Sequence, residues 1–336
     1  MCSAHFYEEK TYMFTNTSNL PMSVAAWLAH DDYDHSSDPY NVSATTLLKP
    51  IKSIVLGSRL VNHSVTDIAD LIPSRMGTAV HTAIENAWLS NNLKEHLLSL
   101  RYSTKLVENI VINPTADQLT EDSVPIYMEL RGSKKVGKYT VSGKFDFVSG
   151  GVLEDFKTTG TYSYVNQSNA KKYIQQGSIY KWLHSDIITE DYMYIQYIFT
   201  DWSAAKARSD KNYPPMRIVP YRYVLDSVQV TEAFVRERIN LIDMYENSPE
   251  SDMPDCTPAD LWERDPVFKY YKNPNSRARS TKNFTTYYEA NDRLVQDGSV
   301  GIVVEVKGEI KFCSYCPALD ICQQAKGYIE QGRLII

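Results

Sequence analysis

The residues best suited to chemistry lie in one short stretch, residues 141–159, with the sequence VSGKFDFVSGGVLEDFKTT. Apolar Phe145 and Phe147 alternate with charged neighbours, which is typical of a half-buried strand. Gly150-Gly151 follows, and glycine adopts the positive φ angles of a two-residue hairpin turn at little steric cost. The stretch therefore predicts two antiparallel strands joined at the glycine pair.

This hairpin brings charged side chains together. With the glycines at the centre of the loop, Asp146 lies directly opposite Asp155. The same register sets Lys144 opposite Lys157. Residues two apart share a face of a strand, so Lys157 lies beside Asp155, while Glu154 points to the opposite face. Two carboxylates and two ammonium groups are therefore expected to converge.

Facing carboxylates repel each other and destabilise a hairpin, so the arrangement favours a cation between them. Mg²⁺ suits such a site, because it takes one or two carboxylates, keeps several waters and uses substrate phosphate oxygens for the rest. The alternative is a surface hairpin whose aspartates and lysines form ordinary salt bridges.

Two predicted helices carry further polar groups. Residues 73–89 have helical spacing, with His81 and Glu85 four residues apart on one face. Residues 170–185 return to helical spacing and set Gln176 and Tyr180 on one face. A histidine on such a face is also compatible with a purely structural role.

The chain has five cysteines, and Cys313, Cys316 and Cys322 lie close together near its C-terminus. A disulfide framework is not expected in a chain of this size that lacks the pattern of a secretory signal. Their spacing indicates metal ligands.

Length and composition describe an ordinary globular protein. Its 336 residues are 43% hydrophobic, 23% charged and 12% aromatic. The net charge is −6, so the overall charge does not indicate a nucleic-acid partner. No apolar run has the length of a membrane span, and we expect a cytoplasmic protein without membrane contact. A local exception is the segment 264–282, in which six basic residues and one acidic residue are interleaved with aromatic ones. A solvated basic loop is the alternative for that segment.

The order of the predicted elements indicates an α/β protein. Strand patterns in residues 124–158 form an antiparallel meander, helical spacing follows, and two more strands and a helix extend to about residue 245. Proline-rich loops begin after residue 247. We expect an N-terminal extension (1–40), a core (41–247) and a C-terminal basic, cysteine-containing lobe (248–336).

Taken together, these motifs resemble the RecB-type branch of the PD-(D/E)XK nuclease superfamily, which includes many phage exonucleases. The resemblance rests on the order of His81, Asp146, Asp155-x-Lys157, Gln176-x-x-x-Tyr180 and Cys313-x2-Cys316-x5-Cys322, and on the phrases NVSATTLLKP, MGTAVHTAIE, VSGKFDFV and LEDFKTT. It covers roughly residues 41–325. It implies a central mixed β-sheet flanked by helices, with a C-terminal cysteine-rich lobe.

The resemblance also implies roles at the site. Asp146 and Asp155 match the two metal-binding carboxylates, with His81 and the backbone carbonyl of Phe156 as further ligands of Mg²⁺ or Mn²⁺. Lys157 matches the lysine that positions the attacking water and steadies charge on the phosphate. Gln176 and Tyr180 match the helix that supports the site and contacts the nucleic-acid backbone. Glu85 and Glu129 are candidate outer carboxylates, although solvation or a salt bridge explains them equally well.

For the cysteines, the resemblance implies a [4Fe-4S] cluster, with a fourth cysteine that usually lies upstream of the helical histidine. The upstream cysteine here is Cys2, near the N-terminus, so we expect Cys256 to be the fourth ligand instead. A zinc site with four thiolates, or four unpaired buried cysteines, are the alternatives.

The expected function is that of a metal-dependent deoxyribonuclease, an exonuclease acting on the ends of single- or double-stranded DNA. A structure-specific endonuclease and a non-catalytic nucleic-acid-binding module are the alternatives. The expected DNA-binding side chains come from the basic segment: Lys269, Lys272, Arg277, Arg279 and Lys282.

Overall fold

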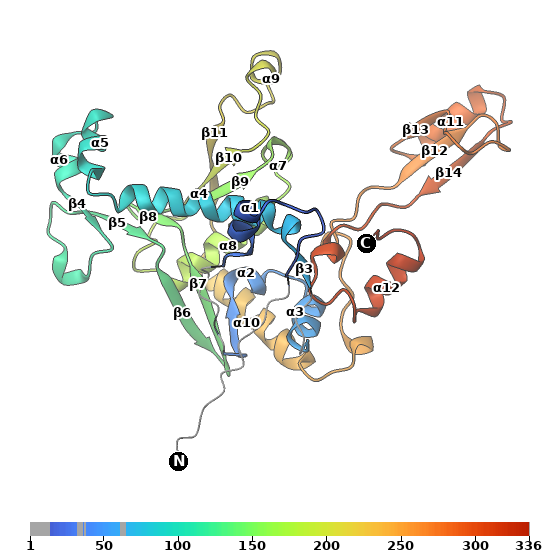
Figure 1. Ribbon diagram of the computed structural model, residues 1–336. Helices are drawn as coiled ribbons and strands as arrows, with labels where there is room; N and C mark the ends of the chain where they lie inside the picture. Colours follow the sequence, from blue (N-terminus) through green and yellow to red (C-terminus); the bar gives the residue numbers. More distant parts are fainter. Residues whose placement is uncertain (1–13, 32–35, 37, 61–64, 336) are drawn as a thin grey trace. The chain divides into compact units, whose positions relative to one another are not determined.

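A computed structural model describes residues 14–31, 36, 38–60 and 65–335 (Figure 1). They form two compact units, and each is described by itself. The first contains the described parts of Met1–Leu48 and Asn62–Asn240, and the second contains those of Lys49–Val61 and Leu241–Ile336. Among the described residues, no helix combines the length and apolar character that crossing a membrane requires.

The first unit is built on a six-stranded mixed sheet. In the order in which the strands pair, it comprises β11 (Ile218–Val224), β10 (Tyr192–Phe199), β9 (Val152–Thr159), β8 (Phe147–Ser149), β5 (Val124–Met128) and β4 (Ile110–Ile112). A second sheet has the order β2 (Asn41–Ser43), β7 (Tyr139–Lys144), β6 (Arg131–Val136), and a third pairs β1 (Phe14–Thr15) with β3 (Thr66–Asp67).

Helices cover both faces of the large sheet. Gln176 of α8 (Ala170–Leu183) reaches Asp155 of β9, whereas His81 of α4 (Ile72–Trp88) meets the neighbouring Phe156. Because successive residues of a strand point to opposite faces, the two helices lie on opposite sides of β9. The predicted fold class, a mixed sheet flanked by helices, is therefore confirmed. The remaining helices of this unit are α1 (Met22–Ala29), α2 (Ala44–Leu47), η1 (Ile68–Leu71), α5 (Leu93–Ser99), α6 (Thr104–Glu108), η2 (Ala116–Gln118), α7 (Thr161–Val165) and α9 (Ala204–Ser209); α10 (Val228–Tyr245) runs into the second unit.

The predicted register of the hairpin is confirmed for its strand pairs. β8 and β9 are antiparallel, with Phe147 opposite Glu154 and Ser149 opposite Val152. The two glycines between them both have positive φ, +56° at Gly150 and +77° at Gly151. Extended by one residue, the same register sets Asp146, just before β8, opposite Asp155.

The expected partner of Lys144 is wrong. Lys144 ends β7 and pairs with Arg131 of β6, not with Lys157. The physical reason is that the predicted continuous strand breaks after Lys144, where Phe145 is fully buried and the chain passes from the second sheet to the large one. Lys144 therefore leaves the face on which Asp155 and Lys157 lie.

The glycine turn is fixed from outside the hairpin. The carbonyl of Gly151 accepts hydrogen bonds from the backbone N–H groups of Thr189 and Glu190, each at 3.1 Å. A Cβ atom on Gly151 would lie 2.1 Å from Thr189 Oγ1. The second glycine is therefore required both by its positive φ and by this close approach.

The second unit combines a small sheet with short helices. Its strands pair in the order β13 (Lys282–Phe284), β12 (Val267–Tyr271), β14 (Ile302–Val306), all antiparallel. The hydroxyl of Tyr270 donates to Asp297 at 2.9 Å, just beyond the end of α11 (Tyr287–Gln296). Its other helices are α3 (Ile51–Ser58), η3 (Glu250–Asp252), η4 (Phe312–Tyr315) and α12 (Gln323–Glu330).

The structure divides the chain differently from the expected boundaries. The division falls at Asn240 within α10, and α3, expected in the core, belongs to the second unit. The reason is local packing: α3 buries residues such as Val55 and Leu56, and the Arg59 guanidinium donates to the carbonyls of Tyr245, Glu246 and Ser248. The first residues of the expected extension, 1–13, lie outside the described part of the chain.

Candidate metal centre

Asp146 precedes β8 and lies beside strand β9. Its Oδ2 accepts a hydrogen bond from the backbone N–H of Phe156 at 2.9 Å. Burial would raise the pKa of Asp146, but His81, Lys157 and this N–H together hold that pKa below its ordinary value. The carboxylate is therefore kept ionised in a largely buried position.

His81 has one ring nitrogen committed and one directed at Asp146. Nε2 lies 2.9 Å from the carbonyl oxygen of Phe156, and since a carbonyl only accepts, Nε2 carries the hydrogen. In the neutral ring Nδ1 then presents its lone pair, 3.5 Å from Asp146 Oδ1. A lone pair facing a carboxylate oxygen is favourable only with a proton or a metal ion between them. Burial lowers the pKa of His81, but Asp146 and the Phe156 carbonyl raise it by more.

Glu129 completes a compact group with these two residues. One ligand atom each of His81, Glu129 and Asp146 lies within 4.8 Å of the others. Glu129 follows β5 and adopts a positive φ of +53°, which is uncommon for a residue other than glycine. Burial and the charges of Asp146 and Glu85 raise its pKa against the opposing effect of Lys144, with which it forms an ion pair.

Asp155 occupies its expected position but has other partners. It is 1% exposed, forms an ion pair with Lys157 through Oδ2, and accepts a hydrogen bond at Oδ1 from Gln176 at 3.3 Å. Burial, together with the charge of Asp146, raises the pKa of Asp155 to about 6, although Lys157 opposes the shift. The Lys157 ammonium also lies 5.8 Å from the centre of the Tyr173 ring.

Gln176 and Tyr180 lie on one face of α8, as the sequence predicted, and this face is turned toward Asp155. Gln176 Nε2 donates to Tyr180 at 2.9 Å as well as to Asp155, and both side chains are buried. This arrangement orients Asp155. Glu154 points the other way, as predicted, and accepts a hydrogen bond from Gln196 at 2.6 Å.

The residues present fit a divalent metal ion. Two carboxylates and an imidazole with a free lone pair converge, and oxygen with nitrogen ligands suits Mg²⁺ or Mn²⁺. The group contains Glu129 where the resemblance implied Asp155. Glu129 was a candidate outer carboxylate, and no pattern in the sequence indicates the backbone turn that brings it in.

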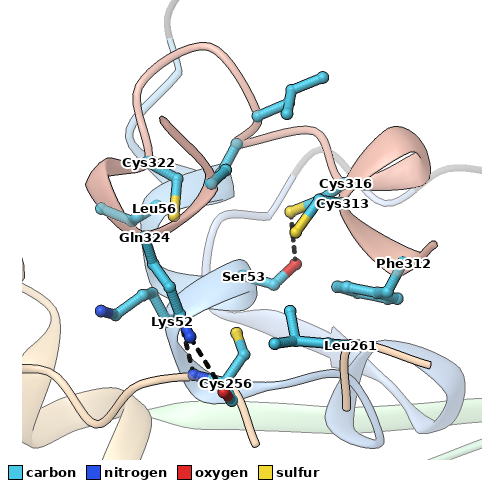
Figure 2. A pocket seen from close by; sticks show the side chains of 13 residues that line it. Lys52, Ser53, Leu56, Cys256, Leu261, Phe312, Cys313, Cys316, Cys322 and Gln324 are labelled. Carbon is cyan, nitrogen blue, oxygen red and sulfur yellow. Dashed lines mark hydrogen bonds between the residues drawn. The ribbon is translucent and has the colours of Figure 1, made fainter. Parts of the chain in front are cut away.

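The cysteines form a second candidate site, in the second unit. Cys256, Cys313, Cys316 and Cys322 are free thiols that line one pocket, and Figure 2 shows their sulfur atoms directed toward its interior. Burial raises the pKa of Cys256 to about 12 and that of Cys313 to about 11, and neighbouring thiols add to both shifts. Cys2 lies outside the described residues.

The expected DNA-binding residues gather on one hairpin of the second unit. Lys269 lies on β12 and Lys282 on β13, while Lys272, Arg277 and Arg279 lie in the connecting loop. All except the half-buried Lys269 are exposed. The Lys282 ammonium lies 5.0 Å from the centre of the Phe284 ring, so basic and aromatic groups meet here as the sequence indicated.

Comparisons with known proteins add little to this description. No family model matches the chain, and no curated protein matches it. One solved structure, described as "Crystal structure of SSO0001", is 15% identical in sequence, with 67% of this chain and 83% of that chain covered and a TM-score of 0.38. A likeness at this TM-score carries no argument about fold or function.

Proposed function

We propose that this chain is a metal-dependent deoxyribonuclease of the PD-(D/E)XK type, acting as an exonuclease on DNA. The observation that carries the proposal is the orientation of His81. Its Nε2–H is committed to the Phe156 carbonyl, and its Nδ1 faces Asp146 with Glu129 alongside. This donor set is the kind that a hard divalent cation takes.

In this proposal His81, Glu129 and Asp146 hold Mg²⁺ or Mn²⁺, with the Phe156 carbonyl adjacent. When bound, the ion supplies Lewis-acid stabilisation of the negative charge that develops on the phosphodiester. The N–H of Phe156 orients Asp146, and the Phe156 carbonyl orients His81. The backbone of one residue, Phe156, thus positions two of the proposed ligands, Asp146 and His81.

Asp155 and Lys157 supply the second half of the site. Lys157 offers a positive charge to the phosphate and a donor to the attacking water. Asp155 holds the lysine ammonium in place, and Gln176 with Tyr180 holds Asp155. We retain Asp155 in the site as the partner of Lys157, opposite Asp146.

DNA is the proposed substrate because the chain offers exposed basic side chains despite its net charge of −6. The hairpin that carries Lys269 and Lys282 combines cations with aromatic rings, a surface suited to phosphates and bases. The proposed compartment is the cytoplasm, where free thiols such as those of the cysteine pocket stay reduced.

The test uses end-labelled linear DNA, single- and double-stranded, with Mg²⁺, with Mn²⁺ and with a chelator. We expect degradation only with metal, and a loss of at least about 100-fold in Asp146→Asn and Lys157→Met. Glu154→Gln is the matched control, since it alters a carboxylate that neighbours Asp155 but faces away. Degradation by Lys157→Met at the rate of the parent would contradict the assignment.

Circular DNA separates the alternatives. An exonuclease leaves closed circles intact, and a structure-specific endonuclease opens those that contain a branch or flap. A binding module would retain DNA under every condition and cleave none. Full occupancy of DNA without cleavage in either metal would establish this third alternative.

We also propose that Cys256, Cys313, Cys316 and Cys322 hold a metal group, either a [4Fe-4S] cluster or Zn²⁺. Its support is the convergence of four buried or half-buried free thiols on one pocket. Purification without oxygen, followed by metal analysis, tests it. Iron with broad visible absorbance indicates the cluster, zinc without colour indicates the mononuclear site, and a chain free of both metals excludes the proposal.

A further inference from the structure

Helix α3 brings two polar side chains into the cysteine pocket. Ser53 and Lys52 both line it, and both are at most 4% exposed although neither is apolar (Figure 2). Both come from a segment that was expected from the sequence to belong to the core, residues 41–247. The contact between Ser53 and Cys316 joins residues 263 apart in the chain. Packing alone does not require a hydroxyl and an ammonium group at these positions.

Ser53 contacts a sulfur atom directly. Its Oγ lies 3.2 Å from Cys316 Sγ, within hydrogen-bond distance for sulfur. Ser58, one and a half turns further along the same helix, bonds instead to the carbonyl of Val55 within α3. The two serines differ in this respect, and only Ser53 is turned toward the cysteines.

Lys52 joins the two chain segments that carry Cys256 and Cys322. Its Nζ lies 2.5 Å from Asp255, the residue before Cys256, and 3.9 Å from Glu250. Glu250 in turn accepts a hydrogen bond at 2.8 Å from the N–H of Gln323, the residue after Cys322. The Lys52 ammonium is thus paired with two carboxylates, and its buried side chain ties the segment of Cys256 to that of Cys322.

The chemistry of four thiolates explains why these groups are useful. Four thiolates around Zn²⁺ carry a net charge of about −2, and an oxidised [4Fe-4S] cluster with four cysteines carries the same charge. Buried negative charge is tolerated only with nearby positive charge and hydrogen-bond donors. Groups that donate to metal ligands also fix their orientation and commonly change metal affinity about 10- to 100-fold.

We propose that Ser53 and Lys52 are positioning residues of the cysteine metal site. The Ser53 hydroxyl donates to the Cys316 thiolate, and the Lys52 ammonium, through Asp255 and Glu250, fixes the segments that carry Cys256 and Cys322. The inference rests on the proposed cysteine site. It assigns helix α3 to that site as an essential part, beyond the four sulfur ligands.

The experiment compares the full-length parent with Ser53→Ala, Ser53→Thr and Ser58→Ala. The measurements are metal content per chain, the rate of metal transfer to a chelator, and the thiolate-to-metal charge-transfer band of the iron form or of a Co²⁺-loaded form. We expect Ser53→Ala to lose metal about 10- to 100-fold faster and to shift the band to lower energy, because the sulfur is no longer stabilised by a donor. Ser53→Thr, which keeps the hydroxyl, restores both values, and Ser58→Ala resembles the parent.

A second pair keeps the test decisive if Ser53→Ala folds poorly. Lys52→Met should weaken metal retention, and Lys52→Arg, which keeps the charge, should not. Equal retention and an unshifted band in Ser53→Ala, or equal retention in the two Lys52 variants, would overturn the role of that residue while leaving the cysteine site intact. A parent chain that binds neither iron nor zinc would overturn both this inference and the site on which it rests.

Discussion

The two candidate sites of this molecule differ in how their charges are balanced. In the site around Asp146, each buried carboxylate has a cation or imidazole beside it: Asp155 has Lys157, Glu129 has Lys144, and Asp146 has His81. In the cysteine pocket, burial raises the pKa of Cys256, Cys313 and Cys322, so these three thiols resist losing their protons until a metal binds. We therefore expect the first site to be stable without an ion and the second to depend on the metal proposed for it.

Removal of each metal should change the stability of the two units by very different amounts. Loss of the group held by the cysteines should destabilise the second unit by on the order of 10 kcal/mol, the scale of structural metal sites. Return to buffer without Mg²⁺ should leave unfolding of the first unit almost unchanged. Calorimetry of the parent and of Cys322→Ser measures both. Equal losses from the two treatments would show that the sites do not differ.

The next largest effect concerns protons. With pKa values of about 12 and 11, Cys256 and Cys313 are protonated near pH 7, and each thiol must release its proton to bind metal. Affinity for zinc should therefore rise with pH, by up to about tenfold per pH unit for each thiol that binds, because the released protons are favoured by high pH. Calorimetry in buffers of different ionisation enthalpy counts the protons. Metal binding at the Asp146 site should release at most about one proton.

Lys157→Met tests the ion pair between Lys157 and Asp155 in the first site. It leaves Asp155 buried without its partner, which should destabilise the fold by about 3 to 5 kcal/mol. Asp155→Asn combined with Lys157→Met should recover much of that loss, since neither charge is then left alone. Denaturant unfolding of the two single variants and the double variant gives the interaction free energy between Asp155 and Lys157. Additive losses would mean that the two side chains do not interact.

The smallest effect separates Glu129 from Asp155 as a metal ligand. Glu129→Gln should weaken Mn²⁺ binding about 10- to 100-fold, because it replaces a charged carboxylate of the compact group with a neutral amide. Asp155→Asn should reduce binding less, as its oxygens face Lys157 and Gln176. Titration with Mn²⁺, followed by its paramagnetic signal, measures both. The opposite ranking would restore the arrangement that the resemblance implied.

The sequence predicts most of the first site because that site is local. The pairing of Phe147 with Glu154 follows from alternation and a glycine turn, and these act over a few residues. The helix of His81 and the shared face of Gln176 and Tyr180 likewise follow from spacing within one element. The break after Lys144 could not be predicted, because it depends on pairing with Arg131 and on the burial of Phe145 in the folded chain.

Much less of the second site could be predicted from the sequence, because part of it depends on contacts between distant residues. The spacing of Cys313, Cys316 and Cys322 indicates metal ligands, but Ser53 joins them only through packing across 263 residues. No periodicity or motif in residues 49–61 marks a serine as a partner of a cysteine. Such contacts are set by tertiary packing, which local patterns do not record.

The two tight turns of the hairpins would respond differently to an inserted peptide tag. At Gly137, between β6 and β7, an added Cβ would meet nothing within 4 Å, although its φ of +62° favours glycine. At Gly151 the same atom would meet Thr189, and the turn is hydrogen-bonded to residues 189 and 190. A label or affinity epitope could therefore be placed after Gly137, whereas an insertion at the Gly150-Gly151 turn would displace Asp155 from Asp146.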